Sequence, residues 1–460
     1  MSSTIESPKS KKTGRPSVDV QQVLKGDRIP PAVSLQARSE YVTAVDTIPV
    51  SRYIDPAFHA LEVSRMWTRV WQYACWTHDI PNPGDVSVYR NAGQSILIVR
   101  QKDGGLKAFP NSCLHRGREI CGKSGGFQQL RCPYHGFSWE LDGSSKWMPA
   151  EWDFAHVDPA KFSLPEVKVS EWNGFIFVNF DPNAMSLEKY LGKFIEQWKE
   201  WDFKNKRYRA VTVTKAVNCN WKAVSEAFME ALHVFSTHPE LAPFAPATTA
   251  QYDTYEDEPH FARFHAIVGK PAPELAREST EQDVLDGFTS SYLSEVYGTD
   301  AAKLQSGETA RQGLARLSRA AYRDRLGLDV SAMPEAELLD AVQYSVFPNM
   351  HVWPSLANPL VYRFFPGATP DVCTWETSLY LPFEGTRPSS GKSFSLTAEQ
   401  SLAEVAELGL FGPLLQQDTE NLKYLQDGLK ASVTGVLQLS CYQESGIRHF
   451  HKTLQHYVEG

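Results

Sequence analysis

Two short stretches of the sequence each combine a thiol, an imidazole and a glycine within five residues. The first reads CLHRG (residues 113–117) and the second reads CPYHG (residues 132–136). Thiolate sulfur and imidazole nitrogen together suit a tetrahedral metal ion or an iron–sulfur centre. Glycine allows the tight loops that would bring such ligands together. The two stretches therefore predict one metal centre built from both.

The mixed composition of each stretch favours one kind of centre over another. Zinc fingers usually place Cys with Cys and His with His, whereas here Cys113 is followed by His115, and Cys132 by His135. A Rieske [2Fe–2S] centre has two Cys on one iron and two His on the other. We interpret these four residues as the ligands of such a cluster, with a structural zinc site as the alternative. Cys121, between the two stretches, is interpreted as an ordinary loop or core cysteine.

A second candidate metal site lies in NWKAVSEAFMEALHVFSTHPE, which contains His233 and His238. On one continuous helix these two residues would point about 140° apart. Pro239 disfavours the α conformation at the residue before it, so His238 is predicted to lie past the helix end, where both imidazoles can converge on one ion. Glu230 falls on the same helical face as His233 and could hold its far ring nitrogen. Two ordinary surface histidines are the alternative.

These motifs resemble those of the Rieske non-haem iron oxygenases, specifically the α subunits of aromatic-ring-hydroxylating enzymes such as naphthalene dioxygenase. CLHRG…CPYHGFSWELDG resembles the cluster motif, NWK…E…H…H the iron-site motif, and QQDTENLKYLQDGL the segment with the third iron ligand; together the resemblance covers about residues 45–440. It implies that His233, His238 and Asp418 bind a mononuclear Fe(II). Two His and one carboxylate leave positions open for O₂ and substrate. Glu230 resembles the carboxylate that connects one subunit's cluster to the iron ligand of the next.

The choice of Asp418 rests on this resemblance alone. Glu404, Glu407, Glu420 and Asp427 are carboxylates on the same predicted helical stretch, and spacing does not separate them from Asp418.

The sequence also departs from the family pattern near the iron site. Family members often have Glu-Asn and Tyr where this chain has Glu226-Ala227 and Leu232, so the surroundings of the iron are expected to be more apolar. Residues near this helix are candidates for the pocket wall, with core packing as the alternative: Phe228, Met229, Leu232 and Phe235.

The chain has 460 residues, beyond the size at which one hydrophobic core stops growing, so two domains are expected. Short β-rich runs with glycines follow position 84, and helical patterns dominate later. We predict an α+β protein, with an N-terminal all-β Rieske domain and a C-terminal catalytic domain of antiparallel sheet covered by helices. The predicted parts are a flexible arm (1–45), a leading helix (58–75) within the cluster domain (46–180), and the catalytic domain (181–460) with a helical insertion (about 270–342).

Composition excludes several classes of protein. A formal charge of -8 argues against a nucleic-acid binder, and no apolar run is long enough for a membrane span. The N-terminus lacks the apolar core of a secretory signal, and seven cysteines show no disulfide framework. A cytoplasmic location is expected. The cluster stretch has four basic residues against one acidic residue, a patch that could steer an acidic electron donor.

The resemblance implies the terminal component of a multicomponent oxygenase that hydroxylates or dihydroxylates an aromatic or other apolar small molecule. The chain has no G-x-G-x-x-G dinucleotide motif, so electrons are expected to come from NAD(P)H through a separate flavin reductase, a ferredoxin, or both. Trimers of α subunits, with or without a β subunit, are expected. The alternatives are a monooxygenase performing N- or O-demethylation, a non-catalytic Rieske electron-transfer protein, and a zinc-stapled binding module.

Overall fold

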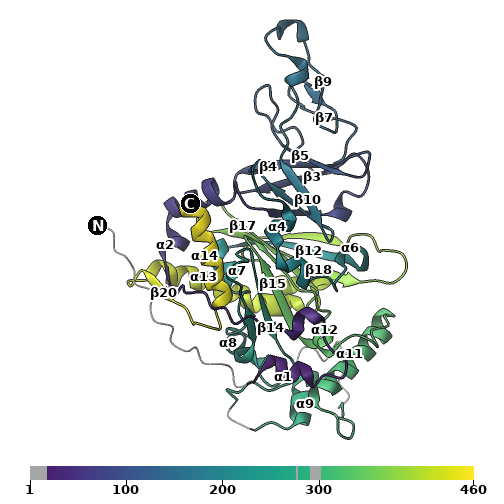
Figure 1. The fold of residues 1–460 in the computed structure, drawn as a ribbon, viewed down its shortest axis with the longest axis vertical. Helices are drawn as coiled ribbons and strands as arrows, with labels where there is room; N and C mark the ends of the chain where they lie inside the picture. Colours follow the sequence, from purple (N-terminus) through teal and green to yellow (C-terminus); the bar gives the residue numbers. More distant parts are fainter. Residues whose placement is uncertain (1–17, 276–277, 291–301) are drawn as a thin grey trace. The chain divides into compact units, whose positions relative to one another are not determined.

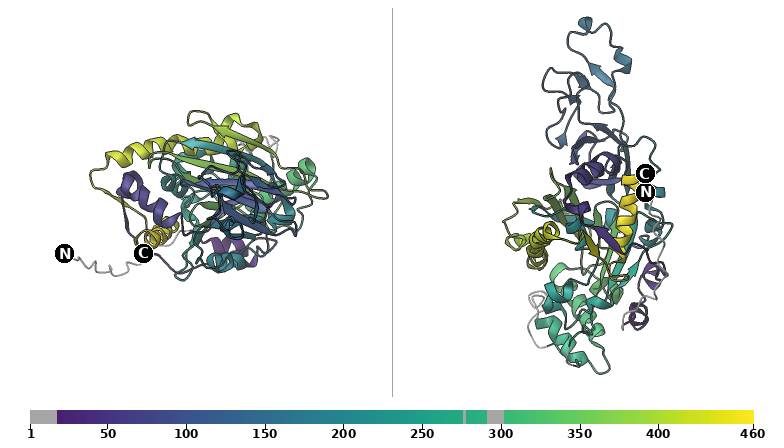
Figure 2. Two further views of the ribbon diagram at one scale, coloured as in Figure 1. Left: turned by 90° about the horizontal axis from the view of Figure 1, so that it is seen from above. Right: turned by 90° about the vertical axis from the view of Figure 1, so that its left-hand side faces the viewer.

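The computed structural model describes residues 18–275, 278–290 and 302–460. The chain divides into two compact units, which are described separately (Figures 1 and 2). Unit 1 comprises the chain up to His59, Leu191–Trp201 and Lys206–Gly460, and unit 2 comprises Ala60–Tyr190 and Asp202–Asn205.

The regular structure of unit 2 is mainly short strands joined by loops, in three small sheets of order β10-β11-β2, β5-β4-β3-β6 and β7-β8-β9. Its core holds Phe109, Phe137 and Trp139 together with the thiols of the two predicted cluster stretches. The strands are β2 (Gln72–Trp76), β3 (Asp85–Asn91), β4 (Gln94–Arg100), β5 (Leu106–Pro110), β6 (Gly125–Gly126), β7 (Leu130–Arg131), β8 (Ser138–Trp139), β9 (Ser145–Trp147), β10 (Lys168–Trp172) and β11 (Phe175–Asn179).

Unit 1 contains an eight-stranded sheet of order β13-β14-β15-β16-β17-β18-β12-β19. Neighbouring strands are antiparallel, except that β19 runs parallel to β12. The strands are β12 (Arg207–Val217), β13 (Gln251–Asp253), β14 (Phe261–Ala266), β15 (Ala341–Val346), β16 (Met350–Val352), β17 (Leu360–Pro366), β18 (Cys373–Pro382) and β19 (Lys392–Leu396). A separate pair joins β1 (Thr47–Pro49) to β20 (Val436–Gln438).

Helices cover this sheet. The C-terminal α14 packs against β13 and β14, α7 packs against β17 and β18, and α13 packs against α7 and β12 (Figure 1). The longer helices are α9 (Glu281–Ser290), α11 (Ala310–Leu326), α13 (Phe411–Ala431) and α14 (Ser445–Glu459), and the shorter ones include α7 (Trp221–Glu226), α8 (Val234–Thr237) and α12 (Glu335–Leu339). The predicted α+β class, an all-β part followed by an antiparallel sheet with helices, is confirmed.

The predicted helix over 58–75 is only partly correct. Helix α3 (Pro56–Leu61) continues into one π-helical turn (Glu62–Met66), but β2 then begins at Gln72. Every residue of β2 is buried, and the strand pairs with β11. Its aromatic residues pack well on a pleated sheet, and this tertiary pairing overrides the helical spacing.

The prediction of a flexible arm over 1–45 is wrong for residues 18–45, which pack on unit 1; residues 1–17 lie outside the described residues. Helix α1 (Val20–Lys25) buries Val20 and Leu24. Gln21 donates from Nε2 to Gln251 Oε1 at 2.9 Å. Figure 1 draws α1 at the same end of unit 1 as α9 and α11. Apolar burial and polar contacts together compensate the entropy of ordering this segment.

A buried ion-pair network joins this segment to the helical insertion. Arg311 on α11 pairs with Asp27 and with Asp340, each at 2.6 Å, and Asp340 also contacts His265 at 2.9 Å. All four side chains are at most 4% exposed. The N-terminal segment, α11 and the end of α12 therefore meet at one guanidinium, and Asp340 connects this pair to β14.

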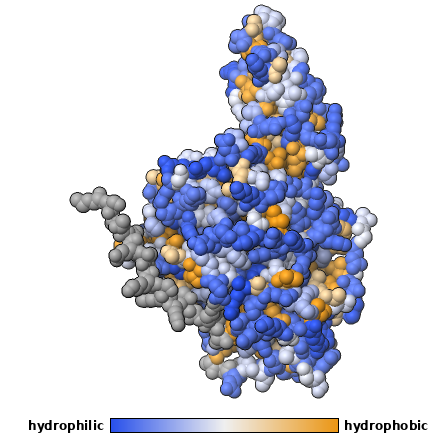
Figure 3. Space-filling model, in the orientation of Figure 1, coloured by the Kyte–Doolittle hydropathy of each residue, from blue (hydrophilic) through white to orange (hydrophobic). Residues whose placement is uncertain are grey.

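No helix in the described part of the chain is long and apolar enough to cross a membrane. In the view of Figure 3, the surface is mainly hydrophilic, with small and separated apolar groups.

We predict that Arg311→Leu lowers the free energy of urea unfolding of unit 1 by about 3–5 kcal/mol, because removing one partner leaves buried carboxylates uncompensated. The matched control is Arg323→Leu on the same helix, whose pair with Asp324 is 70% and 62% exposed; we expect a change of at most about 1 kcal/mol there. Equal losses in the two variants would show that the buried network contributes no more to stability than an exposed ion pair.

Candidate metal centres and the cavity beside one of them

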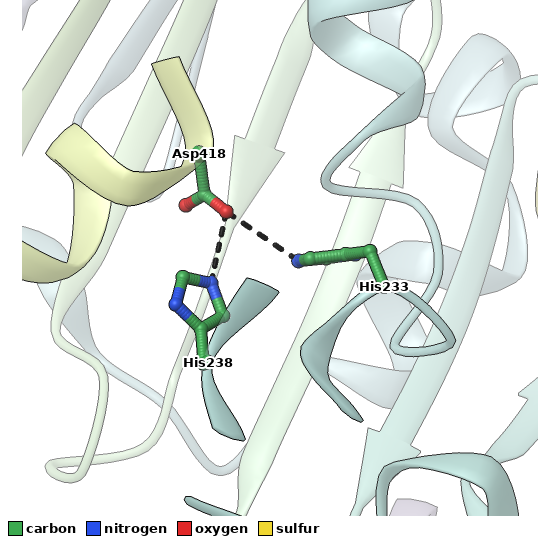
Figure 4. A group of neighbouring side chains, drawn as sticks. All are labelled: His233, His238 and Asp418. Atoms are coloured by element: carbon green, nitrogen blue, oxygen red, sulfur yellow. Dashed lines mark hydrogen bonds and ion pairs between the residues drawn. The ribbon is translucent and has the colours of Figure 1, made fainter. Parts of the chain in front are cut away.

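Three side chains of unit 1 converge on one point: His233, His238 and Asp418. One candidate ligand atom from each lies within 4.8 Å of the others. Asp418 Oδ1 is 2.9 Å from His238 Nε2 and 3.6 Å from His233 Nε2. Figure 4 shows the carboxylate, from α13, directed at both imidazoles. The residues that the resemblance selected are thus brought together by the fold.

The backbone around the two histidines is not the single helix that the sequence suggested. Helix α7 ends at Glu226, and α8 spans only Val234–Thr237, with His233 and His238 at its two caps. His238 has φ -125° and ψ 60°, so the prediction that it lies outside the α conformation is confirmed.

Tertiary hydrogen bonds explain why the helix is interrupted. The Phe228 carbonyl accepts from the side-chain amide of Gln343, and the Ala231 N–H donates to Tyr252 Oη at 2.9 Å. The Phe228 ring packs on Trp375, with centroids 4.8 Å apart. Backbone groups that a helix would pair internally are therefore satisfied by side chains of the sheet, and the chain turns both histidines toward α13.

Each histidine is oriented through its outer nitrogen. His233 Nδ1 lies 2.6 Å from Glu230 Oε1, and His238 Nδ1 lies 2.6 Å from Gln417 Oε1. Both Nδ1–H groups therefore donate outward, which leaves both Nε2 lone pairs for the shared point. The contact between Glu230 and His233 is that predicted, although it forms in a turn and not on a helical face. Gln417 was not predicted; its position next to Asp418 was the only available signal.

The electrostatics of the site favour a cation. Burial opposes protonation of His233, but the hydrogen bond and charge of Glu230 and the charge of Asp418 outweigh it and raise the pKa of His233. Two imidazoles and one carboxylate, with room for further ligands, form the donor set of non-haem Fe(II) oxygenases. The residues present therefore fit a mononuclear iron.

The competing carboxylates point elsewhere. Asp418 is buried with Leu415 and Leu422 on the inner face of α13, whereas Glu420 and Asp427 on the same helix are exposed. Glu404 and Glu407 lie in short turns before the helix and are exposed too. Only Asp418 among these five acids reaches the histidines.

A cavity of about 230 Å³ opens beside the three converging side chains, which form part of its wall. Of the predicted wall residues, Phe228 lines it, whereas Met229 is buried elsewhere and Leu232 is 40% exposed. The insertion contributes Phe288 from α9. Most of the wall is apolar, including Ala231, Val234, Leu241, Phe244, Ala245, Phe264, Ile267, Val268, Leu338, Leu339, Trp353, Leu360, Tyr362, Phe411, Leu414 and Leu415.

In unit 2 the two cysteine stretches form loops of one design. In each, the Cys N–H donates to the carbonyl five residues later, and the Gly N–H donates back to the Cys carbonyl, at 2.8–3.0 Å. Gly117 and Gly136 have φ of +75° and +89°, a conformation that side chains disfavour. The repeated geometry explains why each stretch ends in glycine.

The side chains on these loops suit the predicted cluster. Cys113 and Cys132 are buried free thiols, and burial, with the neighbouring Cys132 thiol, raises the pKa of Cys113. The rings of His115 and His135 lie 4.8 Å apart, and the buried His115 Nδ1 has no hydrogen-bond partner among the described residues. Two adjacent thiols and two adjacent imidazoles form the Cys₂His₂ set of a Rieske cluster. Cys121 is a buried core thiol, as predicted, and burial raises its pKa to about 11.

Comparison with known families agrees with both sites. Residues 196–460 match the model of the ring hydroxylating alpha subunit (catalytic domain), and residues 70–158 match the Rieske [2Fe-2S] domain. The catalytic model alone covers more than half of the chain, so the chain belongs to the α subunits of the Rieske non-haem iron oxygenases. The cofactors of these two domains are a Rieske [2Fe–2S] cluster and a mononuclear iron.

Curated relatives include both monooxygenases and dioxygenases. The chain is 31% identical over 198 residues to the carnitine monooxygenase oxygenase subunit of Escherichia coli K12 (42% of this chain and 52% of that protein). It is 28% identical over 229 residues to the glycine betaine monooxygenase oxygenase subunit of Pseudomonas aeruginosa (49% and 52%). It is 31% identical over 280 residues to chlorobenzene dioxygenase subunit alpha of Cupriavidus sp. PS12 (56% and 60%). The chain thus spans about half the length of the first curated relatives that it matches.

Solved structures show the same fold over nearly the whole chain. A quaternary ammonium Rieske monooxygenase with L-carnitine has a TM-score of 0.62 at 20% identity, covering 90% of this chain and 96% of that one. Naphthalene 1,2-dioxygenase with indole has a TM-score of 0.62 at 17% identity, covering 91% and 93%.

We predict that purified enzyme contains three iron atoms per chain, two in the cluster and one mononuclear. Asp418→Ala and His238→Ala should lower this to two, without changing the visible Rieske spectrum, because the cluster is held by unit 2. Iron analysis with absorbance spectroscopy measures both quantities. Glu420→Ala, an exposed acid on the same helix, should keep all three irons; retention of the third iron in Asp418→Ala would rule out Asp418 as a ligand.

Proposed function

We propose that this protein is the terminal component of a multicomponent Rieske oxygenase and inserts oxygen into a small molecule bound in the cavity of unit 1. The observation that carries the proposal is the position of His233, His238 and Asp418 on the wall of an apolar cavity, in a chain that also has a Rieske domain. The cluster would be held by Cys113, His115, Cys132 and His135. A purely electron-transferring protein would have no use for such a cavity.

We infer that the substrate has an N-methyl group and is demethylated by monooxygenation. The monooxygenases among the relatives named above favour this reading, and so does the cavity. Its wall includes the rings of Phe228, Trp353 and Tyr362, and two carboxylates, Glu230 and Asp418. Aromatic faces and carboxylates both attract a methylated ammonium group.

In this reaction O₂ supplies one oxygen atom to the methyl carbon and the other to water, with two electrons and two protons consumed. The hydroxylated methyl group leaves as formaldehyde and the nitrogen retains a hydrogen. When bound, the iron supplies oxygen activation and the cluster supplies electrons. The chain's own residues orient the imidazoles through Glu230 and Gln417, exclude water with the apolar wall and hold the substrate against the ligand set.

The electrons would come from NAD(P)H through a separate reductase, with or without a ferredoxin. We also infer a trimer of this chain, alone or with a β subunit.

Dihydroxylation of an aromatic ring is the second candidate. The match to chlorobenzene dioxygenase subunit alpha extends over a larger part of this chain than the match to the monooxygenases, and the cavity wall is mostly apolar.

Turnover under ¹⁸O₂ with a surrogate reductase distinguishes the two reactions. We expect N,N-dimethylbenzylamine to release formaldehyde in proportion to oxygen consumed, with one labelled oxygen atom in the newly formed formaldehyde and none in the amine product. A cis-diol with two labelled atoms from toluene, without formaldehyde from the amine, would favour dihydroxylation.

We further propose that Glu230 is a positioning residue for electron delivery. Its Oε1 accepts from His233 Nδ1 at 2.6 Å, and its Oε2 accepts from the His233 backbone N–H at 3.0 Å. A carboxamide replaces one of these two acceptor oxygens with an NH₂ donor, so Gln in the same position loses one of the two bonds. Through His233, this carboxylate would couple the iron site to the cluster of a neighbouring subunit.

We predict that Glu230→Gln keeps all three irons but slows oxidation of the reduced cluster at least about 10-fold in single-turnover stopped-flow experiments. The expected slowing follows from the loss of one charge-assisted hydrogen bond to His233. Glu240→Gln, a half-exposed acid two residues after His238, is the control and should oxidise its cluster at the parent rate. An unchanged rate in Glu230→Gln would contradict the role of Glu230.

A further inference from the structure

Two polar side chains on the cavity wall belong neither to the metal site nor to its supporting shell. Trp353 and Asn358 both line the cavity, and both lie on the connection between β16, which ends at Val352, and β17, which begins at Leu360. The insertion, β14 and α13 contribute only apolar residues to the wall, apart from Asp418.

Within the described residues, neither polar group is used by the protein. The Asn358 carboxamide makes no hydrogen bond there; the only bond of this residue is from its backbone carbonyl, which accepts from Leu360 N at 2.8 Å. The Trp353 indole N–H likewise has no acceptor in the described residues, although its ring packs on Tyr362 with centroids 4.5 Å apart. Neither group is enclosed by the protein, so water or a ligand can reach it, and a ligand that covers it without supplying a hydrogen-bond partner incurs a cost.

The connection that carries them is rigidly held from three sides. Leu356 N–H donates to Glu337 O at 2.8 Å, and the Leu356 carbonyl accepts from Tyr322 Oη at 2.7 Å. The Pro354 carbonyl accepts from Arg207 at 3.1 Å. Backbone bonds to α12 and side chains from α11 and β12 thus fix the loop, and a fixed loop holds a binding group in place before the ligand arrives.

Charge limits what these groups can bind. The wall of the cavity includes the carboxylates of Glu230 and Asp418, and no Lys or Arg is among its described lining residues. When bound, the iron offsets the charge of the carboxylates at the ligand set, but a carboxylate of the substrate at the Asn358 end would be buried without a Lys or Arg partner, which is costly. A neutral oxygen acceptor, by contrast, can accept from the carboxamide NH₂ and from the indole N–H.

We propose that Asn358, together with the Trp353 N–H, forms a subsite for a neutral oxygen-bearing group of the substrate: a carbonyl, hydroxyl or ether on an otherwise apolar frame. The enzyme therefore selects neutral polar substituents and rejects carboxylates at this end of the cavity. This inference rests on the proposed function, since it assumes that the cavity is the substrate site, but it does not depend on which oxygenation follows.

The test uses binding, so that it is separate from turnover. Dissociation constants of the holoenzyme for benzamide, benzoate and toluene, three ligands of similar size, are measured by equilibrium dialysis. We expect benzamide to bind at least 3-fold more tightly than toluene, and the affinity for benzoate not to depend on Asn358. Asn358→Leu should lower the affinity for benzamide about 3- to 10-fold, which corresponds to one net hydrogen bond. The affinity for toluene should stay the same or rise. Trp353→Phe, which keeps an aromatic ring but removes the N–H, should also weaken benzamide more than toluene.

Two results would overturn the subsite. One is an equal loss of affinity for benzamide and toluene in Asn358→Leu, which would mean that Asn358 acts only by packing. The other is a loss of affinity for benzoate in Asn358→Leu as large as that for benzamide, which would mean that the subsite also accepts a carboxylate. Formaldehyde release from N,N-dimethylbenzylamine, measured on the same variants, separates the two proposals. If Asn358→Leu weakens the binding of benzamide more than that of toluene, but no formaldehyde forms, N-demethylation is wrong and the subsite stands. If formaldehyde forms but the variant weakens both ligands equally, the reaction stands and the subsite is rejected.

Discussion

The buried carboxylate of Asp418 imposes an electrostatic requirement that the surrounding elements of unit 1 must meet. Only 6% of this side chain is exposed, and it faces two imidazole nitrogens at the wall of an apolar cavity. A buried anion is costly unless cations or hydrogen bonds compensate it. Here the Nε2 atoms that face it, in imidazoles oriented from behind by Glu230 and Gln417, present lone pairs and do not by themselves compensate the charge. The arrangement is therefore stable only with a proton or a metal ion at its centre, and its donor set suits iron.

This arrangement depends on an interrupted helix. If α7 continued past Glu226, its regular turn would direct His233 and His238 to different sides. Gln343 and Tyr252, both on strands of the sheet, instead capture the backbone of the segment after α7, and the chain re-forms one short helical turn between the two histidines. The sheet thus does more than support the site: its side chains determine the path of the backbone that presents the ligands.

The sequence predicted those features whose determinants lie close together along the chain. The two cysteine loops are local, since each glycine closes its own hydrogen-bonded turn, and Pro239 acts on its immediate neighbour. Asp418 is 180 residues from His238, and no local rule separated it from Glu420; only the position of α13 against α7 does. The network around Arg311 was beyond prediction for the same reason, because Asp27 and Arg311 are 284 residues apart. The strand β2 was mistaken for helix because its partner, β11, lies a hundred residues later.

The helical insertion contacts both the buried ion-pair network and the wall of the cavity. Through Arg311, α11 is tied to the N-terminal segment and to the end of α12, and Leu338 and Leu339 of α12 form part of the cavity wall. Through Tyr322, the same helix also holds the connection that carries Trp353 and Asn358. One helix therefore fixes both an apolar part and a polar part of the wall, while α13 fixes the carboxylate. Because different elements carry the three converging side chains and the proposed subsite, we expect substitutions on the insertion to change which molecule binds without disturbing His233, His238 or Asp418.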